Sequence, residues 1–384
     1  MKNNYEVDIY ALAYGGAGIG KLDGKVCFVE GALPGERVSF RKLSDKKSFS
    51  TGFVTKIIKP SSDRIEPICP HYGRCGGCQY QHLNYEKEVF YKAQQVQEVI
   101  KRIGGVIEYS FEPMALCVPE YGYRSSVTLH KTRGGYGYFS RDNQNIIAID
   151  RCPLAVDKIN GLISTLDTSN GKRDVTLRSD KLGNVWKSNH QGHRFFKDDY
   201  IGTELTFSPL AFSQANRQIS IDMVRKLRGW LKQEKPGVLF DLYCGVGFFG
   251  ILMRDLFESV IGIDDSPIAI DCAKISKRDI AADNVKFYCN NVTEKFPVYY
   301  QKHGSSMNTI ILDPPRAGID KELAAYLLNL KNTSCLCYIS CDPATLARDI
   351  KLLAQEGGWS LDRISCFDMF ARTKHIESIA LFKR

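Results

Sequence analysis

The sequence lacks the segments that direct a protein into a membrane or fasten it there. Residues 1–14 mix charged, polar and apolar side chains, so they contain no apolar run of signal-peptide length. No stretch of the chain approaches the roughly 18 apolar residues of a membrane-spanning helix. We therefore expect a soluble, cytoplasmic protein that has no membrane partner and needs no obligate protein partner.

The sequence also lacks the pattern of a secreted disulfide scaffold. Its 13 cysteines are an odd number in a chain of 384 residues, and no secretion signal accompanies them. Internal repeats and low-complexity tracts are absent as well. Cys335 and Cys337 lie in an apolar strand pattern and are expected to be buried thiols. The length allows two or three domains with a well-buried core.

An excess of acidic residues is absent too, because the formal net charge is +9 and the sequence pI is about 8.8. A moderate positive charge fits a polyanionic partner such as RNA, since each neutralised phosphate releases counterions. Many soluble proteins carry a similar charge without binding nucleic acid. The charge therefore permits an RNA partner and does not establish one.

The first 60 residues have the pattern of a small β-barrel. Short strand-like segments at 5–12, 26–29, 37–43 and 52–58 are separated by glycine-containing turns. Four basic residues gather in one strand-and-turn segment, where they either meet phosphates or form a solvated hairpin. They are Arg41, Lys42, Lys46 and Lys47.

Beyond a linker at residues 60–63, the chain divides into two regions that differ in their pattern of apolar residues. Residues 85–103 have the apolar spacing of a helix, and residues 106–200 contain strand-like segments with many glycines. After residue 205, apolar strands alternate with helical segments, which is typical of a doubly wound α/β domain with a largely parallel sheet. We expect three domains, at residues 1–60, 61–204 and 205–384.

A glycine-rich loop follows the first strand of this α/β region. Asp241-Leu-Tyr-Cys-Gly-Val-Gly-Phe-Phe-Gly250 stands at a strand-to-helix junction, and Asp264 ends the next strand, where it could accept hydrogen bonds from ribose hydroxyls. The glycines also match G-x-G-x-x-G, so a nicotinamide or flavin cofactor is an alternative. The acid before the loop and the segment Asp313-Pro-Pro-Arg316 favour S-adenosylmethionine instead, because two prolines after an acid have no standard role in hydride transfer.

Cys341 is a candidate nucleophile. It follows the strand at 335–339 and precedes a helix that begins near Pro343, so its thiol should lie in the crevice at the carboxyl ends of the strands, with a lowered pKa. A thiolate that adds to carbon 6 of uracil makes carbon 5 nucleophilic towards a methyl donor, and a base must then remove the carbon 5 proton. Glu377 is the candidate base and His375 is the runner-up. A buried structural thiol is an equally good interpretation from the residues alone.

Five motifs in order along residues 205–384 resemble the RNA uracil-5-methyltransferase family. They are Phe212-Ser-Gln-Ala-Asn216, the loop Asp241-Leu-Tyr-Cys-Gly-Val-Gly247, Asp313-Pro-Pro-Arg316, Ser340-Cys-Asp-Pro-Ala-Thr345 and His375-Ile-Glu377.

The resemblance implies a class I methyltransferase fold and a methyl-donor site. By that resemblance Cys341 is the nucleophile, Glu377 is the proton acceptor, and five residues contact S-adenosylmethionine: Gln214, Tyr243, Asp264, Asn291 and Asp313. One position departs from the family, because Phe248 stands where a small polar residue is usual.

A second cysteine arrangement predicts a metal site. Cys69, Cys75 and Cys78 lie in a glycine-containing loop, and Cys152 is the best candidate for a fourth ligand. Chemistry alone leaves both a four-cysteine zinc ion and a 4Fe–4S cluster open. The resemblance favours the cluster, which a branch of the family carries on this spacing. With four thiolate ligands, a structural or RNA-positioning role is expected rather than radical chemistry.

The first 60 residues resemble a TRAM domain, a small RNA-binding β-barrel. By family analogy this module and the cluster together point to 23S rRNA as the substrate. Two alternatives remain open: the same reaction on a transfer RNA loop, and a cluster-bearing RNA-binding protein without catalytic activity.

Overall fold

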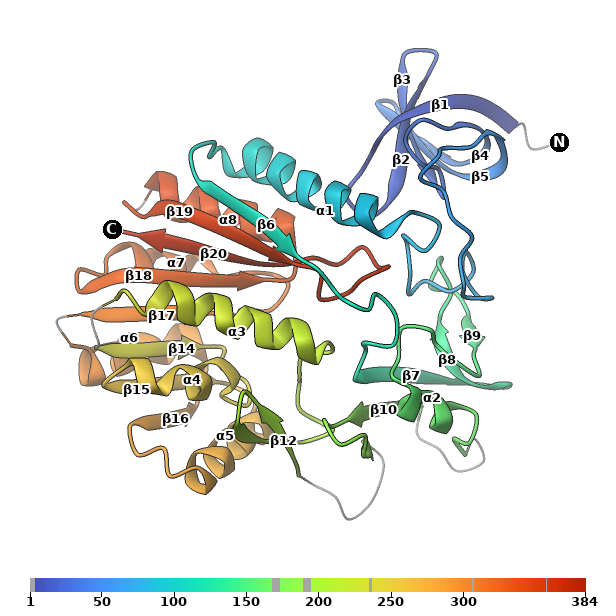
Figure 1. Ribbon diagram of the computed structural model, residues 1–384. Coiled ribbons are helices and arrows are strands. Elements are labelled where there is room, and N and C mark those ends of the chain that lie inside the picture. The colour runs from blue at the N-terminus through green and yellow to red at the C-terminus, as the bar shows by residue number, and fades with distance from the viewer. Residues whose placement is uncertain (1–3, 168–172, 189–194, 235–236, 306, 357) are drawn as a thin grey trace.

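The computed structural model describes residues 4–167, 173–188, 195–234, 237–305, 307–356 and 358–384. In Figure 1 a small barrel at the N-terminal end sits above one end of a long helix. A region of short strands lies below the barrel, and a large sheet with helices on both faces fills the other side. No helix of the described chain is long and apolar enough to cross a membrane.

The N-terminal strands close into a barrel in the order β1-β2-β3-β5-β4, which confirms the predicted β-barrel. Its strands are β1 (Asn4–Leu12), β2 (Ala17–Leu22), β3 (Lys25–Glu30), β4 (Arg37–Asp45) and β5 (Phe49–Lys59). The sequence did not indicate β2, because its glycines read as turn residues. Gly20 is there for close packing instead: a Cβ atom on it would lie 2.5 Å from Val7 Cγ2.

The middle of the sequence forms a smaller sheet in the order β11-β10-β7-β8-β9, beside a hairpin of β12 and β13. The elements are β7 (Ser126–Thr132), β8 (Gly135–Phe139), β9 (Ile146–Ala148), α2 (Asp157–Ile163), β10 (Asp174–Ser179), β11 (Val185–Lys187), β12 (Phe196–Tyr200) and β13 (Thr203–Phe207).

The large sheet has eight strands in the order β16-β15-β14-β17-β18-β20-β19-β6. Strands β14 to β18 are parallel, and β20 runs antiparallel to both of its neighbours. The strands are β6 (Ser110–Ala115), β14 (Val238–Leu242), β15 (Ser259–Asp264), β16 (Val285–Cys289), β17 (Asn308–Leu312), β18 (Thr333–Ser340), β19 (Ser360–Phe367) and β20 (Glu377–Lys383).

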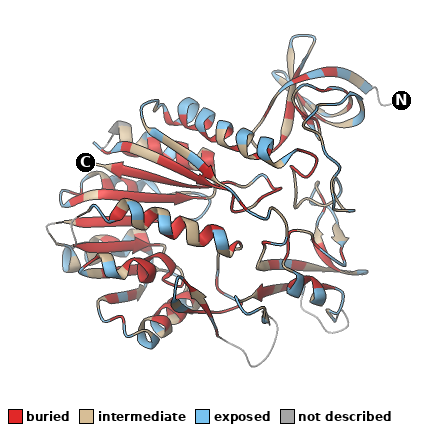
Figure 2. Ribbon diagram, viewed as in Figure 1, coloured by how far each residue is buried: buried red, intermediate tan, exposed pale blue. Residues whose placement is uncertain are grey.

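Helices cover both faces of this sheet, which confirms the predicted doubly wound α/β architecture (Figure 1). They are α1 (Tyr85–Val99) with a π-helical turn (Ile100–Gly104), α3 (Arg217–Leu231), α4 (Phe248–Met253) with a 3₁₀ turn (Arg254–Leu256), α5 (Pro267–Asp279), α6 (Val292–His303), α7 (Lys321–Leu328) and α8 (Pro343–Glu356). Figure 2 shows the central strands buried almost throughout, as expected for a sheet covered on both faces.

Two features of this sheet position the site. Strand order reverses between β14 and β17, and ligands of open α/β sheets bind outside the carboxyl ends of the strands at such a switch point. In addition, β6 and α1 precede the methyltransferase-like motifs in sequence, yet β6 pairs with β19 and α1 packs near α8. The division at residues 60 and 204 stays a prediction.

Candidate active site

The loop between β14 and α4 is folded around two carboxylates. Gly250 N donates a hydrogen bond of 2.8 Å to Asp241 Oδ2, and Gly245 N donates one of 2.8 Å to Asp264 Oδ2. Ser266 N donates to Asp264 Oδ1 at 2.8 Å. A Cβ atom at Gly250 would lie 2.8 Å from Asp241 Oδ2, so only glycine allows this approach. The predicted junction of strand, loop and helix is confirmed.

Carboxylates concentrate at this end of the sheet. Burial, followed by the charge of nearby Asp313, raises the pKa of Asp241 to about 7, although the Gly250 N–H lowers it. Burial and the charge of Asp264 raise the pKa of Asp313 to about 7 as well. The described residues offer no hydrogen-bond partner to Asp241 Oδ1. A positively charged ligand would relieve the repulsion and lower all these pKa values.

The remaining predicted methyl-donor contacts lie at three separate positions. Tyr243 follows β14 in the left-handed region with φ of 61°, and Asn291 caps α6 by accepting a hydrogen bond of 3.1 Å from Glu294 N. Gln214 lies in the segment before α3, and its Oε1 is buried without a partner among the described residues. The contacts of these three side chains with a methyl donor remain predictions.

Cys341 and Glu377 are brought together by strand pairing. Ser340, the last residue of β18, is opposite Ser378 of the antiparallel strand β20. Cys341 follows Ser340 and Glu377 precedes Ser378, so these two residues face one another at the end of the strand pair. Glu377 is 7% exposed, and Cys341 is half-buried. The nucleophile and base predicted from distant motifs are thus neighbours.

The expected lowering of the Cys341 pKa is wrong. Burial, and then the charge of Glu377, raise the pKa of Cys341 to about 11, and only Arg316 lowers it appreciably. Asp342 caps α8, because its Oδ1 accepts hydrogen bonds from Ala344 N at 3.0 Å and Thr345 N at 2.9 Å. The cap satisfies the first amides of α8 and adds a negative charge beside the thiol.

The two candidate bases differ sharply in basicity. Burial, and then the charge of Asp313, raise the pKa of Glu377 to about 8, whereas Arg316 lowers it. Burial, with Arg316 and Lys374 nearby, lowers the pKa of His375 to about 4. A base of pKa near 8 accepts a proton at neutral pH far better than one near 4, so the pKa values favour Glu377 over His375 as the base.

The four cysteines predicted to bind metal line one pocket, together with Arg124 and Tyr138. They are Cys69, Cys75, Cys78 and Cys152. Burial, and then the charge of nearby Cys152, raise the pKa of Cys78 to about 12. Among the described residues no group of three or more His, Cys, Asp or Glu is arranged to hold a metal ion directly. The four thiols nevertheless surround one space, as a cluster would require.

Arg124 gives this pocket a positive charge that no carboxylate of the described residues balances. The guanidinium lies over the ring of Phe370 at 5.8 Å, and its Nε is buried without a partner among the described residues. Burial lowers the pKa of Arg124, but the nearby Tyr123, Tyr138, Cys152 and Cys78 outweigh it and leave that pKa raised. A buried cation needs a negative partner, and four cysteine thiolates around a metal cluster would supply one.

Comparison with known proteins covers nearly the whole chain. A family model described as tRNA (Uracil-5-)-methyltransferase matches residues 202–384, and a TRAM-domain model matches residues 3–41. The 23S rRNA (uracil(1939)-C(5))-methyltransferase RlmD of Aliivibrio fischeri (strain ATCC 700601 / ES114) is 31% identical over 98% of this chain and 96% of its own. This chain belongs to the RNA uracil-5-methyltransferase family. An uncharacterized RNA methyltransferase of Aquifex aeolicus (strain VF5) is also 31% identical, over 98% of both chains.

A solved structure supports the fold of this uracil-5-methyltransferase. The tRNA (uracil-54, C5)-methyltransferase of Pyrococcus abyssi, in complex with S-adenosyl-L-homocysteine, superposes with a TM-score of 0.71 and is 24% identical. The match covers 98% of this chain and 100% of that one. The predicted class I methyltransferase fold with an N-terminal TRAM barrel is therefore confirmed.

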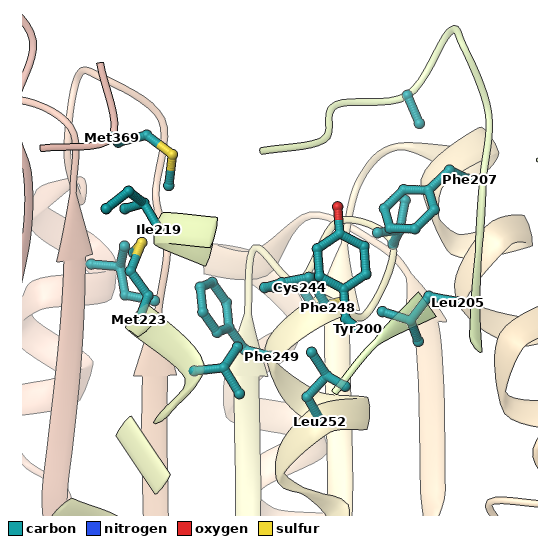
Figure 3. Close-up of a cluster of buried hydrophobic side chains, with 14 of the residues drawn as sticks. Tyr200, Leu205, Phe207, Ile219, Met223, Cys244, Phe248, Phe249, Leu252 and Met369 are labelled. Carbon is teal, nitrogen blue, oxygen red and sulfur yellow. The ribbon is translucent and has the colours of Figure 1, made fainter. Parts of the chain in front are cut away.

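The departure at Phe248 is accommodated in the core of the methyltransferase. Figure 3 shows Phe248 within a cluster of buried apolar side chains, beside Tyr200 and Cys244. Its ring meets that of Tyr200 edge-on at 5.0 Å and that of Phe249 at 5.2 Å. The larger side chain thus joins α4 to the β12–β13 hairpin.

The sequence did not indicate that two further residues, Arg316 and Tyr14, influence the pKa values around Cys341 or lie near it. Arg316 stood in a quoted motif, but its charge acts on Cys341, Glu377 and His375 together. Tyr14 comes from the β1–β2 turn of the barrel, and its pKa is raised by burial and by the charges of Asp342 and Cys341. No signal in the sequence connects Tyr14 with a cysteine so far along the chain.

Proposed function

We propose that this enzyme methylates carbon 5 of a uridine in 23S rRNA through a covalent bond between Cys341 and carbon 6. The pairing of β18 with β20 carries the proposal, because it places a thiol and a buried carboxylate of raised pKa side by side. The reaction needs these two groups on one pyrimidine ring.

Each group has one role in this mechanism. The Cys341 thiolate adds to carbon 6 and makes carbon 5 nucleophilic. Carbon 5 takes the methyl group from the sulfonium of S-adenosylmethionine, a substrate, which leaves as S-adenosylhomocysteine. Glu377 then takes the carbon 5 proton, carbon 5 and carbon 6 regain their double bond, and the thiolate leaves. Arg316 favours both anions, because it lowers the pKa of each.

We infer that S-adenosylmethionine occupies the carboxylate-rich end of the sheet. Its sulfonium and ammonium charges complement acids whose pKa values are raised by burial and then by neighbouring carboxylates. The residues proposed to contact it are Gln214, Tyr243, Asp264, Asn291 and Asp313. The unpartnered Oε1 of Gln214 supports this assignment, because a bound ligand would complete its hydrogen bonding.

Four cysteines are proposed to hold a 4Fe–4S cluster: Cys69, Cys75, Cys78 and Cys152. Their shared pocket and the unbalanced charge of Arg124 support the assignment over unligated thiols. With all four irons ligated by the protein, the cluster would organise the polypeptide around it rather than react with the methyl donor.

The names of relatives support 23S rRNA as the substrate, and the transfer RNA enzyme of Pyrococcus abyssi makes tRNA the alternative. The deciding experiment incubates the purified enzyme and labelled S-adenosylmethionine separately with unmodified 23S rRNA and with unmodified bulk tRNA. Label in 5-methyluridine of 23S rRNA alone is the expected result. Label confined to tRNA would overturn the choice of substrate and leave the reaction chemistry in place.

A further inference from the structure

The loop that leads into Glu377 is held by the cysteine-rich loop. Arg372 O, in the connection between β19 and β20, accepts hydrogen bonds from Gln79 N at 3.0 Å and Tyr80 N at 3.1 Å. Two residues later, Lys374 N donates to Gln79 Oε1 at 2.9 Å. Both the backbone and the side chain of Gln79 therefore bind the segment that ends at Glu377.

Gln79 is itself fixed to the cysteine-rich loop. It directly follows Cys78, its Nε2 donates to Gly76 O at 2.9 Å, and its carbonyl accepts from Tyr72 Oη at 2.8 Å. The Gln79 side chain thus donates to one loop and accepts from the other. A movement of the cysteine-rich loop would pass through this residue to residues 372–374.

Buried charges hold the same loop in an unfavourable backbone conformation. Arg372 has φ of 67°, which is uncommon for any residue but glycine. Arg372 N donates to Glu88 Oε1 at 2.7 Å, and Lys92 Nζ bridges Glu88 and Asp368 with hydrogen bonds of 2.7 Å each. The loop keeps this shape because its neighbours impose it, so removal of one contact should let it relax.

We propose that Gln79 is a positioning residue for proton abstraction: it couples the cysteine-rich loop to the loop that aims Glu377 at carbon 5. The proposal rests on the proposed function of Glu377. Abstraction is the last chemical step, in which the carbon 5 proton goes to the carboxylate, its electron pair forms the carbon 5–carbon 6 double bond, and the sulfur–carbon 6 bond breaks. A displaced Glu377 therefore leaves a methylated RNA bound to Cys341.

The test compares Gln79→Ala with Glu377→Gln and with the control Gln94→Ala, which alters an exposed residue of α1. Each protein is mixed with natural substrate RNA and S-adenosylmethionine labelled in the methyl group, then run on a denaturing gel. Gln79→Ala should accumulate a methyl-labelled protein–RNA adduct and release product at least about tenfold more slowly, because small misplacements of a reacting group are costly. Gln94→Ala should match the wild type.

A second measurement tests the contact without using catalysis. Hydrogen exchange at the Lys374 amide should speed up by about tenfold in Gln79→Ala, because its acceptor is gone. Gln79→Glu puts a carboxylate oxygen in place of the amide oxygen as acceptor and should restore much of the protection. Unchanged exchange at Lys374 in Gln79→Ala would overturn the proposal, and so would slow turnover with no methylated adduct.

Failure of the proposed function would look different. If wild-type enzyme forms no adduct with RNA that contains 5-fluorouridine, the covalent mechanism fails whatever Gln79 does. If wild type is trapped by 5-fluorouridine and Gln79→Ala turns over natural RNA at the wild-type rate, the mechanism stands and the positioning role of Gln79 is refuted.

Discussion

The raised pKa of Glu377 makes activity depend on pH in a specific direction. Its ordinary pKa is 4.5 and its value in the fold is about 8. At about 1.4 kcal/mol for each pKa unit, the environment opposes ionisation by roughly 5 kcal/mol. The base acts only when it is ionised, so kcat/KM should fall as pH falls through about 8. At about pH 6, roughly one free enzyme in a hundred would carry the carboxylate.

The measurement is kcat/KM for RNA methylation from about pH 6 to about pH 9, which reports groups of the free enzyme. Wild type should gain more than tenfold per pH unit below about 8, because the Cys341 thiolate, whose pKa is about 11, also forms as pH rises. Glu377→Gln should lose activity by about 10²–10⁴ and lose the inflection near pH 8, keeping only the rise that comes from Cys341. Glu322→Gln, at an exposed site on α7, is the control. A wild-type profile with the same slope as that of Glu377→Gln over this range would refute the assignment of Glu377 as a base of raised pKa.

Three further predictions concern stability and the cysteine pocket. Gly250→Ala should lower the free energy of unfolding by about 1–3 kcal/mol, because its Cβ atom would meet Asp241. The control Gly229→Ala, on α3, has open space for its Cβ atom and should leave that free energy unchanged or raise it. Chemical denaturation measures both. Lys92→Met should lower that free energy by about 3–5 kcal/mol, because it leaves buried Asp368 without its cation and Glu88 with Arg372 alone, and an unchanged denaturation midpoint would contradict this. Cys78→Ser should reduce the iron content and visible absorbance of protein purified without air, and iron bound as in the wild type would contradict the four-cysteine assignment.

The parts of the site that depend on local sequence could be predicted. The glycine loop between Asp241 and Gly250 follows from the need for backbone amides to approach a carboxylate closely. The placement of Cys341 at a strand end follows from the apolar run before it and from Asp342-Pro343 after it. Such signals lie within a few residues, where spacing determines geometry.

The rest depends on contacts between distant segments. The pKa of Cys341 was predicted with the wrong sign, because the sequence placed it at a helix start but revealed neither its burial nor Glu377 as a neighbour. The addition of β6 to the far edge of the sheet and the approach of Tyr14 to the active site are likewise products of tertiary packing. Periodicity carries no information about such partners.

Trapping with RNA that contains 5-fluorouridine tests the central claim most directly. Fluorine at carbon 5 cannot leave as a proton, so an enzyme that adds through Cys341 and then methylates carbon 5 should remain bound to the RNA on a denaturing gel. The account predicts a methyl-labelled adduct with the wild type and none with Cys341→Ala. An adduct that persists in Cys341→Ala would contradict the assignment of the nucleophile. The absence of any adduct with wild type and its correct RNA would contradict the covalent mechanism itself.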